Sequence, residues 1–280
     1  MADLTDVKAL LFDCFGTVVD WRGSVTRQLE LVGREYGIGW LFSSVPALLL
    51  IAVTLLADGN WKEFAHTWRV GYIENTISPY EFNAHPSTRI AAGGKGPLNI
   101  DVMHRQILEQ ILGTPEWKAL GDKLDTEARD KLTLVWHRLD GWLDTTPGLY
   151  ELKREVIIGT LSNANGRLLV DMAKYADLPW DIVFSSEFFS SFKPDPKVYL
   201  GGVENLSLQP HECAMVAAHV NDLLAAEKLG MRTIYIPRPE EELEFPDVGE
   251  VKPKTDGGSV DLVVHSFTEL AGLLAQRFKK

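Results

Sequence analysis

Four polar side chains stand at or just beyond the ends of short apolar runs and are candidates for chemistry: Asp13, Ser162, His219 and Asp222. Asp13 comes after four apolar residues and shortly before Gly16, so its carboxylate is predicted to project from the tip of a strand into a tight turn. A carboxylate in such a place can act as a nucleophile or can cap the turn through hydrogen bonds. Because ligands of open α/β sheets bind outside the carboxyl ends of the strands, we predict a site that contains these four side chains.

Short apolar runs at six places in the sequence are typical of buried strands. They cover residues 7–15, 156–161, 182–184, 214–218, 233–236 and 261–265. Helical patterns such as residues 198–206 and 223–229 lie between them, and Ser266 with Glu269 predicts a capping box for the last helix. The alternation of strands and helices predicts the α/β class, with a parallel sheet covered on both faces.

Residues 21–144 show no comparable strand pattern and instead suit amphipathic helices. The helical spacings cover residues 26–36, 61–74, 102–112 and 126–139. The sequence therefore predicts a core domain of residues 1–20 and 145–280 and a helical cap domain of residues 21–144. The glycine-rich residues 93–97 are expected to be a cap loop, because they lack the G-K-[ST] ending of a phosphate-binding loop.

The composition indicates a globular protein with a small-molecule partner. Of the 280 residues, 45% are hydrophobic and 24% are charged, which excludes a disordered or collagen-like chain. The formal net charge of −11 repels the phosphate backbone on average, so no nucleic-acid partner is expected. Cys14 and Cys213 show no metal-ligand spacing and suit a reducing, cytoplasmic setting. We expect no secretory signal at the N-terminus, and a solvated excursion over the acidic residues 240–258.

Residues 36–57 carry no charged side chain, and their second half is almost wholly aliphatic. This length is nearly enough to span a bilayer. Ser43, Ser44 and Pro46 interrupt the run, and its flanks show no excess of basic residues, so a buried cap helix is expected in place of a membrane span. The alternatives for this unusual apolar insertion, at about residues 39–57, are a homodimer contact and an error in the gene model.

Four segments, in this order along the chain, resemble the motifs of the haloacid dehalogenase superfamily. They are residues 12–17 (FDCFGT), 161–163 (LSN), 192–196 (FKPDP) and 216–222 (VAAHVND). Residues 18–22, 136–139 and 197–199 are more closely similar to the (S)-2-haloacid dehalogenases, also called type II dehalogenases. The resemblance implies a Rossmann-like parallel sheet core with an inserted helical cap domain, and it makes Asp13 the attacking carboxylate.

The chain departs from the phosphatases of this superfamily at two positions. Those enzymes carry a second Asp two residues after the nucleophile and bind magnesium through paired acids of the fourth motif. Here Phe15 replaces the second Asp, and Asp222 is the single acid of residues 216–222. A hard divalent cation prefers several oxygen ligands, so we expect neither a metal nor another cofactor. Halide leaves carbon as a stable anion without a proton donor, which favours dehalogenation over the two alternatives, a magnesium-dependent phosphatase and a non-catalytic or membrane-associated relative.

The resemblance implies a hydrolytic dehalogenase that converts short 2-haloalkanoic acids into 2-hydroxy acids. Asp13 attacks C2 and expels halide, and water then hydrolyses the aspartyl ester. Lys193 is expected to hold Asp13 ionised, since a nearby ammonium lowers the pKa of a carboxylate. Asp222 is assigned to the hydrolytic water, and Ser162 completes the catalytic set as a hydrogen-bond donor to the substrate.

The remaining expected contacts of the haloacid surround this nucleophile. They are Asn163, the backbone N–H groups of Cys14 and Phe15, Thr17 and Tyr199. The family also draws an arginine from the cap to bind the carboxylate or the departing halide, and Arg69 is the candidate. Arg22 and Arg105 are the alternatives for this role, because a helical arginine is more often a solvent-facing charge than an anion clamp.

His219 is the most informative departure from the type II pattern. Typical members carry Ser and Asn where this chain has Ala217 and His219. A subset credited with accepting fluorinated acids is similar in having His at this place. We therefore hypothesise that haloacetates, fluoroacetate included, are substrates and that the imidazole holds the fluoride. A buried histidine with a backbone partner is the alternative.

Overall fold

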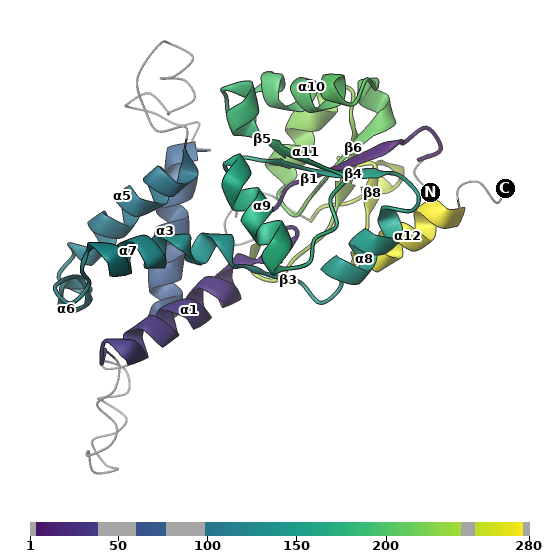
Figure 1. The fold of residues 1–280 in the computed structure, drawn as a ribbon. Coiled ribbons are helices and arrows are strands. Elements are labelled where there is room, and N and C mark those ends of the chain that lie inside the picture. The colour runs from purple at the N-terminus through teal and green to yellow at the C-terminus, as the bar shows by residue number, and fades with distance from the viewer. Residues whose placement is uncertain (1–3, 39–59, 77–98, 242–249, 277–280) are drawn as a thin grey trace.

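The computed structural model describes residues 4–38, 60–76, 99–241 and 250–276 of the chain (Figure 1). Within these ranges no helix is long and apolar enough to cross a membrane. The apolar insertion at about residues 39–57 and the glycine-rich residues 93–97 lie outside the described residues, so both stay predictions.

A six-stranded parallel sheet forms the centre of the described structure (Figure 1). Its strands, in spatial order, are β5 (Ile182–Ser185), β4 (Ile157–Ser162), β1 (Ala9–Phe12), β6 (Cys213–Ala217), β7 (Arg232–Tyr235) and β8 (Leu262–Val263). Each of the six apolar runs forms one of these strands, so the predicted α/β fold is confirmed. Phe12 at the end of β1 pairs with Thr160 of β4 and Val216 of β6, which brings the tips of these three strands together.

Helices cover both faces of the sheet, as the strand–helix alternation predicts. One face carries α8 (Thr145–Leu152), α9 (Gly166–Tyr175) and α12 (Phe267–Gln276), and the other carries α10 (Pro196–Asn205) and α11 (Val220–Glu227). Leu10 and Phe12 of β1 pack into the first cluster, whereas Ala9 and Leu11 pack into the second. Because alternate strand residues point to opposite faces, a fully buried β1 needs four apolar residues in a row.

Short helical turns and a capping box complete this part of the chain. The 3-10 helices are η2 (Ser186–Phe189), η3 (Pro210–Glu212) and η5 (Lys254–Asp256). At the start of α12, the backbone N–H of Glu269 donates to Oγ of Ser266 at 3.0 Å, as predicted. The Glu269 carboxylate accepts from the backbone of His265 at 2.7 Å, one residue earlier than the motif implies.

The described residues between β2 (Val19–Asp20) and residue 138 form a group of helices beside the sheet (Figure 1). They are α1 (Trp21–Glu35), α3 (Trp61–Thr76), α5 (Ile100–Leu112), α6 (Lys118–Gly121), α7 (Thr126–Thr133) and η1 (Leu134–His137). The rings of the buried Trp68 and Trp136 meet almost at right angles, with centroids 5.6 Å apart, and link α3 to η1. Residues 126–139, predicted as one helix, divide into α7 and η1. The exact domain boundaries stay a prediction.

A two-stranded antiparallel ribbon joins these helices to the sheet. β2 pairs with β3 (Asp140–Gly141), with Val19 opposite Gly141 and Asp20 opposite Asp140. The prediction that residues 21–144 contain no strand is therefore wrong at β3. A strand of two residues is too short to show the alternation of apolar and polar residues from which strands are predicted.

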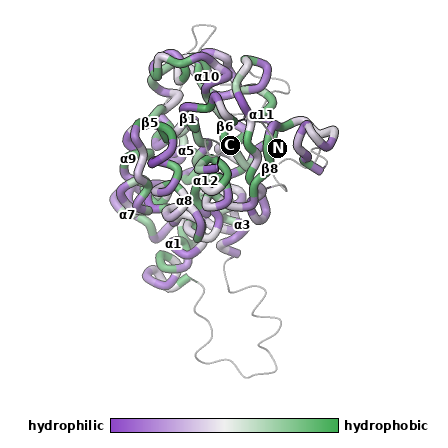
Figure 2. Tube along the Cα trace, turned by 90° about the vertical axis from the view of Figure 1, so that its right-hand side faces the viewer, coloured by the Kyte–Doolittle hydropathy of each residue, from purple (hydrophilic) through white to green (hydrophobic). Residues whose placement is uncertain are grey.

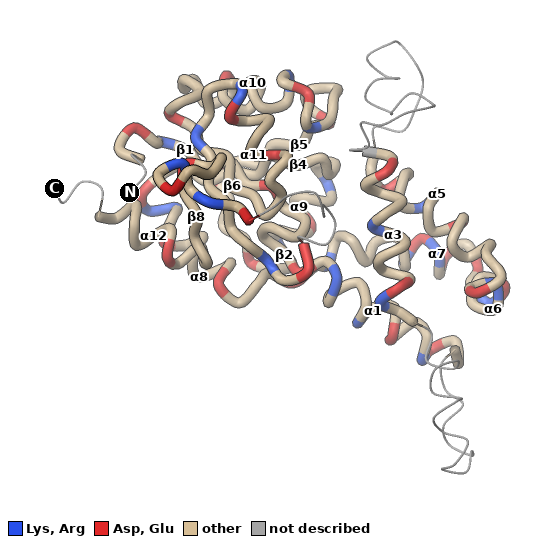
Figure 3. The backbone as a smooth tube through the Cα atoms, turned by 180° about the vertical axis from the view of Figure 1, so that it is seen from behind, with Lys and Arg blue, Asp and Glu red and all other residues tan. Residues whose placement is uncertain are grey.

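Charged residues of both signs are interspersed on the outer helices (Figure 3), and along these helices hydrophilic and hydrophobic residues alternate (Figure 2). Some of the charges pair within the helical group: Nε of Arg105 lies 2.7 Å from Glu109, and the same guanidinium contacts Asp130. Arg105, an alternative candidate for the anion clamp, is thus engaged with carboxylates of the helical group itself.

Candidate active site

Asp13 lies directly after β1, where the sequence places it. Its backbone N–H donates to the carbonyl oxygen of Val216 at 3.0 Å, which continues the pairing with β6 by one residue. Gly16 then takes a positive φ of 80°, a conformation that glycine adopts without strain, and the chain turns back toward β2. The Asp13 side chain is 12% exposed and is the centre of a buried network of charged groups.

On one side of this network, Lys193 bridges two carboxylates. Its Nζ lies 3.0 Å from Oδ1 of Asp13 and also pairs with Oδ2 of Asp222. The hydroxyl of Tyr199 donates to the other oxygen of Asp222. The structure therefore brings together three predicted catalytic residues and one predicted substrate contact, which come from β1, the loop before α10, α10 itself and the first turn of α11.

Asn163 fixes the backbone of Lys193. The amide oxygen of Asn163 accepts from the backbone N–H of Lys193 at 2.7 Å, and its amide nitrogen donates to the Lys193 carbonyl at 3.2 Å. Ser162, at the end of β4, is fully buried, and its Oγ accepts from the backbone N–H of Ala164 at 3.3 Å. Both residues hold loop backbone, and their expected hydrogen bonds to the substrate stay predictions.

On the other side of the network, Thr17 and His219 contact the second oxygen of Asp13. The hydroxyl of Thr17 donates to Oδ2 at 3.0 Å and itself accepts from the backbone N–H of Ala218 at 2.9 Å. Nδ1 of His219 lies 3.1 Å from the same Oδ2. His219 therefore contacts the carboxylate side chain of Asp13.

Glu241 is a member of the site that the sequence analysis missed. Its Oε2 lies 3.1 Å from Nε2 of His219, and its Oε1 accepts from the indole N–H of Trp21 at 2.8 Å. Only 2% of the surface of Glu241 is exposed. The prediction that residues 240–258 form a solvent-exposed segment is therefore wrong at Glu241. The prediction followed from acidic composition, whereas the carboxylate is buried because an imidazole and an indole N–H pair with it. Its position beyond the carboxyl end of β7 was the available signal.

The charges of the network reinforce one another. Burial opposes ionisation of Asp13, but the charges and hydrogen bonds of Lys193 and His219 outweigh it and hold the pKa of Asp13 well below its usual range. Burial likewise opposes the charged imidazole, yet hydrogen bonds to Asp13 and Glu241 raise the pKa of His219 to about 10. Despite burial, the carboxylates of Asp13 and Asp222 raise the pKa of Lys193. At neutral pH, Asp13 is thus an ionised carboxylate between two cations.

Asp222 differs from Asp13 in its proton affinity. Burial, together with the negative charge of Asp13, raises the pKa of Asp222 even though Lys193 opposes the shift. Two carboxyl groups that share one lysine therefore have opposite shifts, which is the pattern expected of a nucleophile and a proton acceptor in one site.

Arg69 is the predicted cap arginine that reaches this site. It is 2% exposed, and its guanidinium carbon lies 5.6, 5.3 and 5.2 Å from the ring centroids of Phe15, Trp21 and Tyr72. Phe15 directly follows Cys14, the neighbour of the nucleophile. The second alternative, Arg22, instead lies 3.2 Å from the carboxylate of Glu240 and stacks on Trp21.

Cys14 is buried, with 1% of its surface exposed, and burial raises the pKa of its thiol far above the usual value. Cys213, in β6, is likewise buried, and burial raises the pKa of its thiol to about 12. A thiol of this kind stays protonated and does not act as a nucleophile. Asp13 is therefore the better nucleophile of the two adjacent residues.

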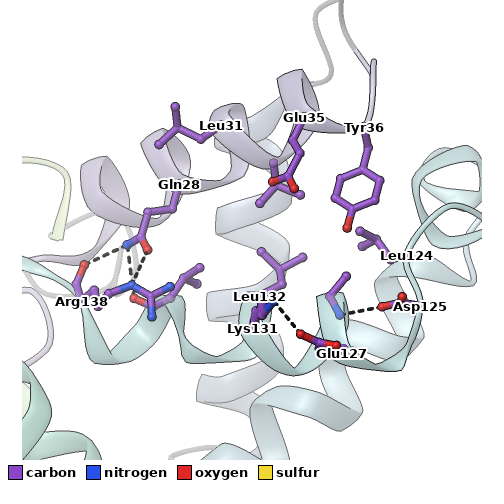
Figure 4. A pocket seen from close by; sticks show the side chains of 13 residues that line it. Gln28, Leu31, Glu35, Tyr36, Leu124, Asp125, Glu127, Lys131, Leu132 and Arg138 are labelled. Carbon is purple, nitrogen blue, oxygen red and sulfur yellow. Dashed lines mark hydrogen bonds and ion pairs between the residues drawn. The ribbon is translucent and has the colours of Figure 1, made fainter.

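A cavity of about 390 Å³ lies apart from this site, between α1 and α7 of the helical group (Figure 4). Its lining is a mixture of charged and apolar side chains, among them Gln28, Glu35, Lys131 and Leu132. None of the candidate catalytic residues lines it. Among the described residues, no cluster of His, Cys, Asp and Glu is arranged to hold a metal ion.

Known proteins share the sequence and the fold of this chain. A sequence model of haloacid dehalogenase-like hydrolases matches residues 7–230. The chain belongs to this hydrolase family. Two solved structures of similar haloacid dehalogenase-like hydrolases align with nearly the whole chain. The defluorinating L-2-haloacid dehalogenase Rha0230 is 33% identical and covers 98% of both chains, with a TM-score of 0.74. The L-2-haloacid dehalogenase PA0810 is 32% identical and covers 96% of this chain and 99% of that one, with a TM-score of 0.72.

Curated relatives of this haloacid dehalogenase-like hydrolase match over a shorter length. (S)-2-Haloacid dehalogenase 4A of Burkholderia cepacia is 28% identical over 155 residues, which are 54% of this chain and 63% of that protein. Phosphatase MT3486 of Mycobacterium tuberculosis is 31% identical over 127 residues, 41% of this chain and 56% of that protein. The chain thus matches about three fifths of the length of these relatives. The predicted resemblance to the superfamily is confirmed.

Proposed function

We propose that this hydrolase is a dehalogenase that converts short 2-haloalkanoic acids into 2-hydroxy acids through an ester on Asp13. The observation that carries the proposal is the buried Asp13 carboxylate, with Lys193 on Oδ1 and both Thr17 and His219 on Oδ2. A phosphate or alkoxide leaving group needs a proton or a metal ion, whereas a halide does not. Phe15 stands in place of a second acid and has no proton to donate, so this site suits the departure of a halide.

In the first step, an oxygen of Asp13 forms a bond to C2 of the substrate while the carbon–halogen bond breaks. The halide departs with the bonding electrons from the opposite face, so the configuration at C2 inverts. In the second step, water adds to the carboxyl carbon of the ester and gives one proton to Asp222, directly or through Lys193. The bond between this carbon and the oxygen attached to C2 then breaks, and the departing oxygen takes that proton from Asp222 to become the product hydroxyl, while the second proton of the water goes to solvent. The product hydroxyl retains the original oxygen of Asp13, which receives its replacement from water.

Fluoroacetate belongs to the proposed substrates because of His219. Its Nδ1 lies 3.1 Å from Asp13 and its Nε2 lies 3.1 Å from Glu241, so Nε2 becomes available to a departing fluoride only when the contact with Glu241 opens. A cationic N–H donor stabilises fluoride more than the larger halides, since the smaller anion accepts the stronger hydrogen bond. Substitution of His219 by Asn is expected to reduce turnover of fluoroacetate more than that of chloroacetate. Equal effects on the two acids would reject the fluoride-specific role.

The deciding experiment compares two substrate classes with the purified protein. Release of chloride from chloroacetate without added metal supports the proposal, whereas release of phosphate from p-nitrophenyl phosphate with magnesium, and no chloride, supports a phosphatase. Mass spectrometry after one turnover in ¹⁸O-labelled water tests the intermediate. Label in Asp13 is expected, and label that enters only the product would falsify the ester mechanism.

A further inference from the structure

Hydrogen bonds use up one oxygen of the Asp13 carboxylate and leave a lone pair on the other. Each carboxylate oxygen has about two lone-pair sites. Oδ2 accepts from the hydroxyl of Thr17 at 3.0 Å and lies 3.1 Å from Nδ1 of His219. Among the described residues, Lys193 alone donates to Oδ1, at 3.0 Å. The lone pair that is available for attack on carbon is therefore on Oδ1.

His219 faces a carboxylate with each of its ring nitrogens. Nδ1 lies 3.1 Å from Asp13, and Nε2 lies 3.1 Å from Oε2 of Glu241. A neutral imidazole has one donor and one acceptor nitrogen, so only the protonated ring donates to both carboxylates. The raised pKa of His219 agrees with this geometry, because its hydrogen bonds to the two carboxylates outweigh the effect of burial.

Glu241 is itself held in one place. Its Oε1 accepts from the indole N–H of Trp21 at 2.8 Å, and 2% of its surface is exposed. A Cβ atom added to Gly16 would lie 2.1 Å from Oε2, so the backbone of this turn confines the carboxylate. The hydrogen bond to His219 and the charges of His219 and Arg69 lower the pKa of Glu241 despite burial. Glu241 is therefore a fixed negative charge on one side of the imidazole ring.

The charge on the other side of the ring changes during the proposed reaction. Asp13 is an anion before attack, becomes a neutral ester, and carries negative charge on an oxygen again when water adds. In the ester, Glu241 is the one charged carboxylate that contacts His219 among the described residues. An N–H donor that meets more negative charge in the transition state than in the ester accelerates hydrolysis.

We propose that Thr17 and His219 form an oxyanion hole for hydrolysis of the ester, and that Glu241 is a positioning residue that keeps His219 protonated and oriented while Asp13 is esterified. The inference rests on the proposed function, because it requires the ester. Oδ1 forms the bond to C2, and Oδ2 remains the carbonyl oxygen between the Thr17 hydroxyl and Nδ1–H of His219.

The second step then runs with these two donors in place. Water adds to the carboxyl carbon and gives one proton to Asp222, and the negative charge that develops on Oδ2 meets the donors of Thr17 and His219. The bond from this carbon to Oδ1 breaks, and Oδ1 departs on C2 as the product hydroxyl with the proton from Asp222. The second proton of the water goes to solvent. The fluoride role uses Nε2 in the first step, whereas this role uses Nδ1 in the second and applies to every halogen.

The test separates the two chemical steps in Glu241→Gln, which keeps the size of the side chain and removes its charge. Rapid-quench mass spectrometry with chloroacetate gives the rates of ester formation and of ester hydrolysis, and near-UV circular dichroism checks the fold. Ester formation is expected within about threefold of the wild type. Hydrolysis is expected to be about tenfold slower or more at about pH 9 and to approach the wild type near pH 6, because each unit by which the pKa of His219 falls removes up to tenfold of the imidazolium at high pH.

The other charged groups around His219 stay unchanged in this variant, so the pH dependence reports the loss of Glu241. Among the described residues they are Asp13, Lys193 and Asp222 on one side and Arg69 on the other. The matched control is Glu240→Gln, which neutralises the exposed neighbour that pairs with Arg22 at 3.2 Å, and it is expected to follow the wild type at every pH.

Two further measurements test the charge directly. In ¹⁵N NMR of the histidine-labelled wild type, the His219 signal is assigned by its absence in His219→Asn, and both ring nitrogens are expected to carry protons at neutral pH. Glu241→Asp keeps the negative charge, so its loss of hydrolysis at high pH should lie closer to the wild type than that of Glu241→Gln.

Several results would overturn the inference. One is a neutral His219 in the wild type at neutral pH. Another is slower hydrolysis by the same factor at every pH in Glu241→Gln, which would mean that shape and not charge matters. An ester that the wild type and Glu241→Gln hydrolyse with the same pH dependence rejects the inference alone. A wild type that forms no ester rejects the proposed function, and the inference with it.

Discussion

The two oxygens of the Asp13 carboxylate face two different networks. Oδ1 faces Lys193, which continues to Asp222 and Tyr199. Oδ2 faces Thr17 and His219, and His219 continues to Glu241 and then to Trp21 at the start of α1.

The first network is built within the elements around the sheet, whereas the second crosses from the sheet to the first helix of the helical group. The first therefore sets the charge and orientation of the nucleophile. The second couples the nucleophile to the part of the molecule that contributes Arg69 and Trp21. Variants on each side should accordingly fail in different ways.

Replacement of Asp13 removes the group that both networks serve and should have the largest effect. Asp13→Asn keeps the shape of the side chain but removes its charge and nucleophilic oxygen. Halide release from chloroacetate is expected to fall by about 10⁴-fold or more, as for loss of a covalent nucleophile. Steady-state assays with an ion-selective electrode measure it. Activity within tenfold of the wild type would remove Asp13 from the mechanism.

Replacement of Lys193 breaks the first network alone. Lys193→Met leaves Asp13 and Asp222 buried next to each other without their shared cation, so the pKa of both should rise. We expect kcat to fall by roughly 10²- to 10³-fold and the free energy of unfolding to fall by about 3–5 kcal/mol, the usual cost of an unpaired buried charge. Urea unfolding provides the second value. The exposed pair of Lys8 with Glu212 offers the control Lys8→Met, for which stability should hardly change. Equal losses in the two variants would contradict the assigned role.

The second network should be visible in the pH dependence of stability. The pKa of His219 is raised to about 10 in the folded protein, above its ordinary value of 6.5. Between these values the folded state holds one more proton than the unfolded state, so the stabilisation is fully present below pH 6.5 and is lost as the pH rises toward 10. The slope for one group is at most about 1.4 kcal/mol per pH unit. Urea titrations at several pH values should show this decline in the wild type and a shallower one in His219→Asn. If the wild type and His219→Asn lose stability with pH at the same rate, the extra proton of the folded state is not on His219.

The hydroxyl of Tyr199 is the outermost contact of the first network and should have the smallest effect. Tyr199→Phe removes the hydrogen bond to Asp222 and keeps the packing of the ring. A hydrogen bond to a charged group contributes roughly 1.5–3 kcal/mol, so the hydrolysis of the ester is expected to slow by about tenfold or somewhat more. Rapid-quench mass spectrometry should show more esterified protein at steady state than in the wild type. Faster loss of the ester would reverse the assignment of Asp222 to the water.

The sequence predicts the first network better than the second. Six apolar runs predict the strands, and the rule that ligands lie at the carboxyl ends of strands brings Asp13, Ser162 and Asp222 to one edge. Lys193 and Tyr199 follow from the resemblance to known motifs. Each of these residues lies within a few positions of a strand or helix that the local sequence predicts.

The sequence predicts Thr17 and His219 of the second network but misses its outer contact between Glu241 and Trp21. Glu241 meets Trp21 across 220 positions, and nothing in the spacing of either residue indicates the partner. The acidic residues around Glu241 are typical of a solvent-exposed segment, because composition does not show which single carboxylate finds a cation in the interior. The two-residue strand β3 was not predicted for a similar reason. It is a strand because it pairs with β2, and its own two residues carry no strand pattern.

Because β2 pairs with β3, with Val19 opposite Gly141, the chain leaves the large sheet for the helical group and returns from it at neighbouring positions. The residues between these two strands take no part in the pairing of the large sheet, although they contribute Trp21 and Arg69 to the candidate site. A change in the length of this segment is therefore expected to leave the strand order of the large sheet unaltered, and with it the place of Asp13 after β1. The apolar residues 39–57 lie between these two strands in the sequence, where added length does not change the register of the six-stranded sheet.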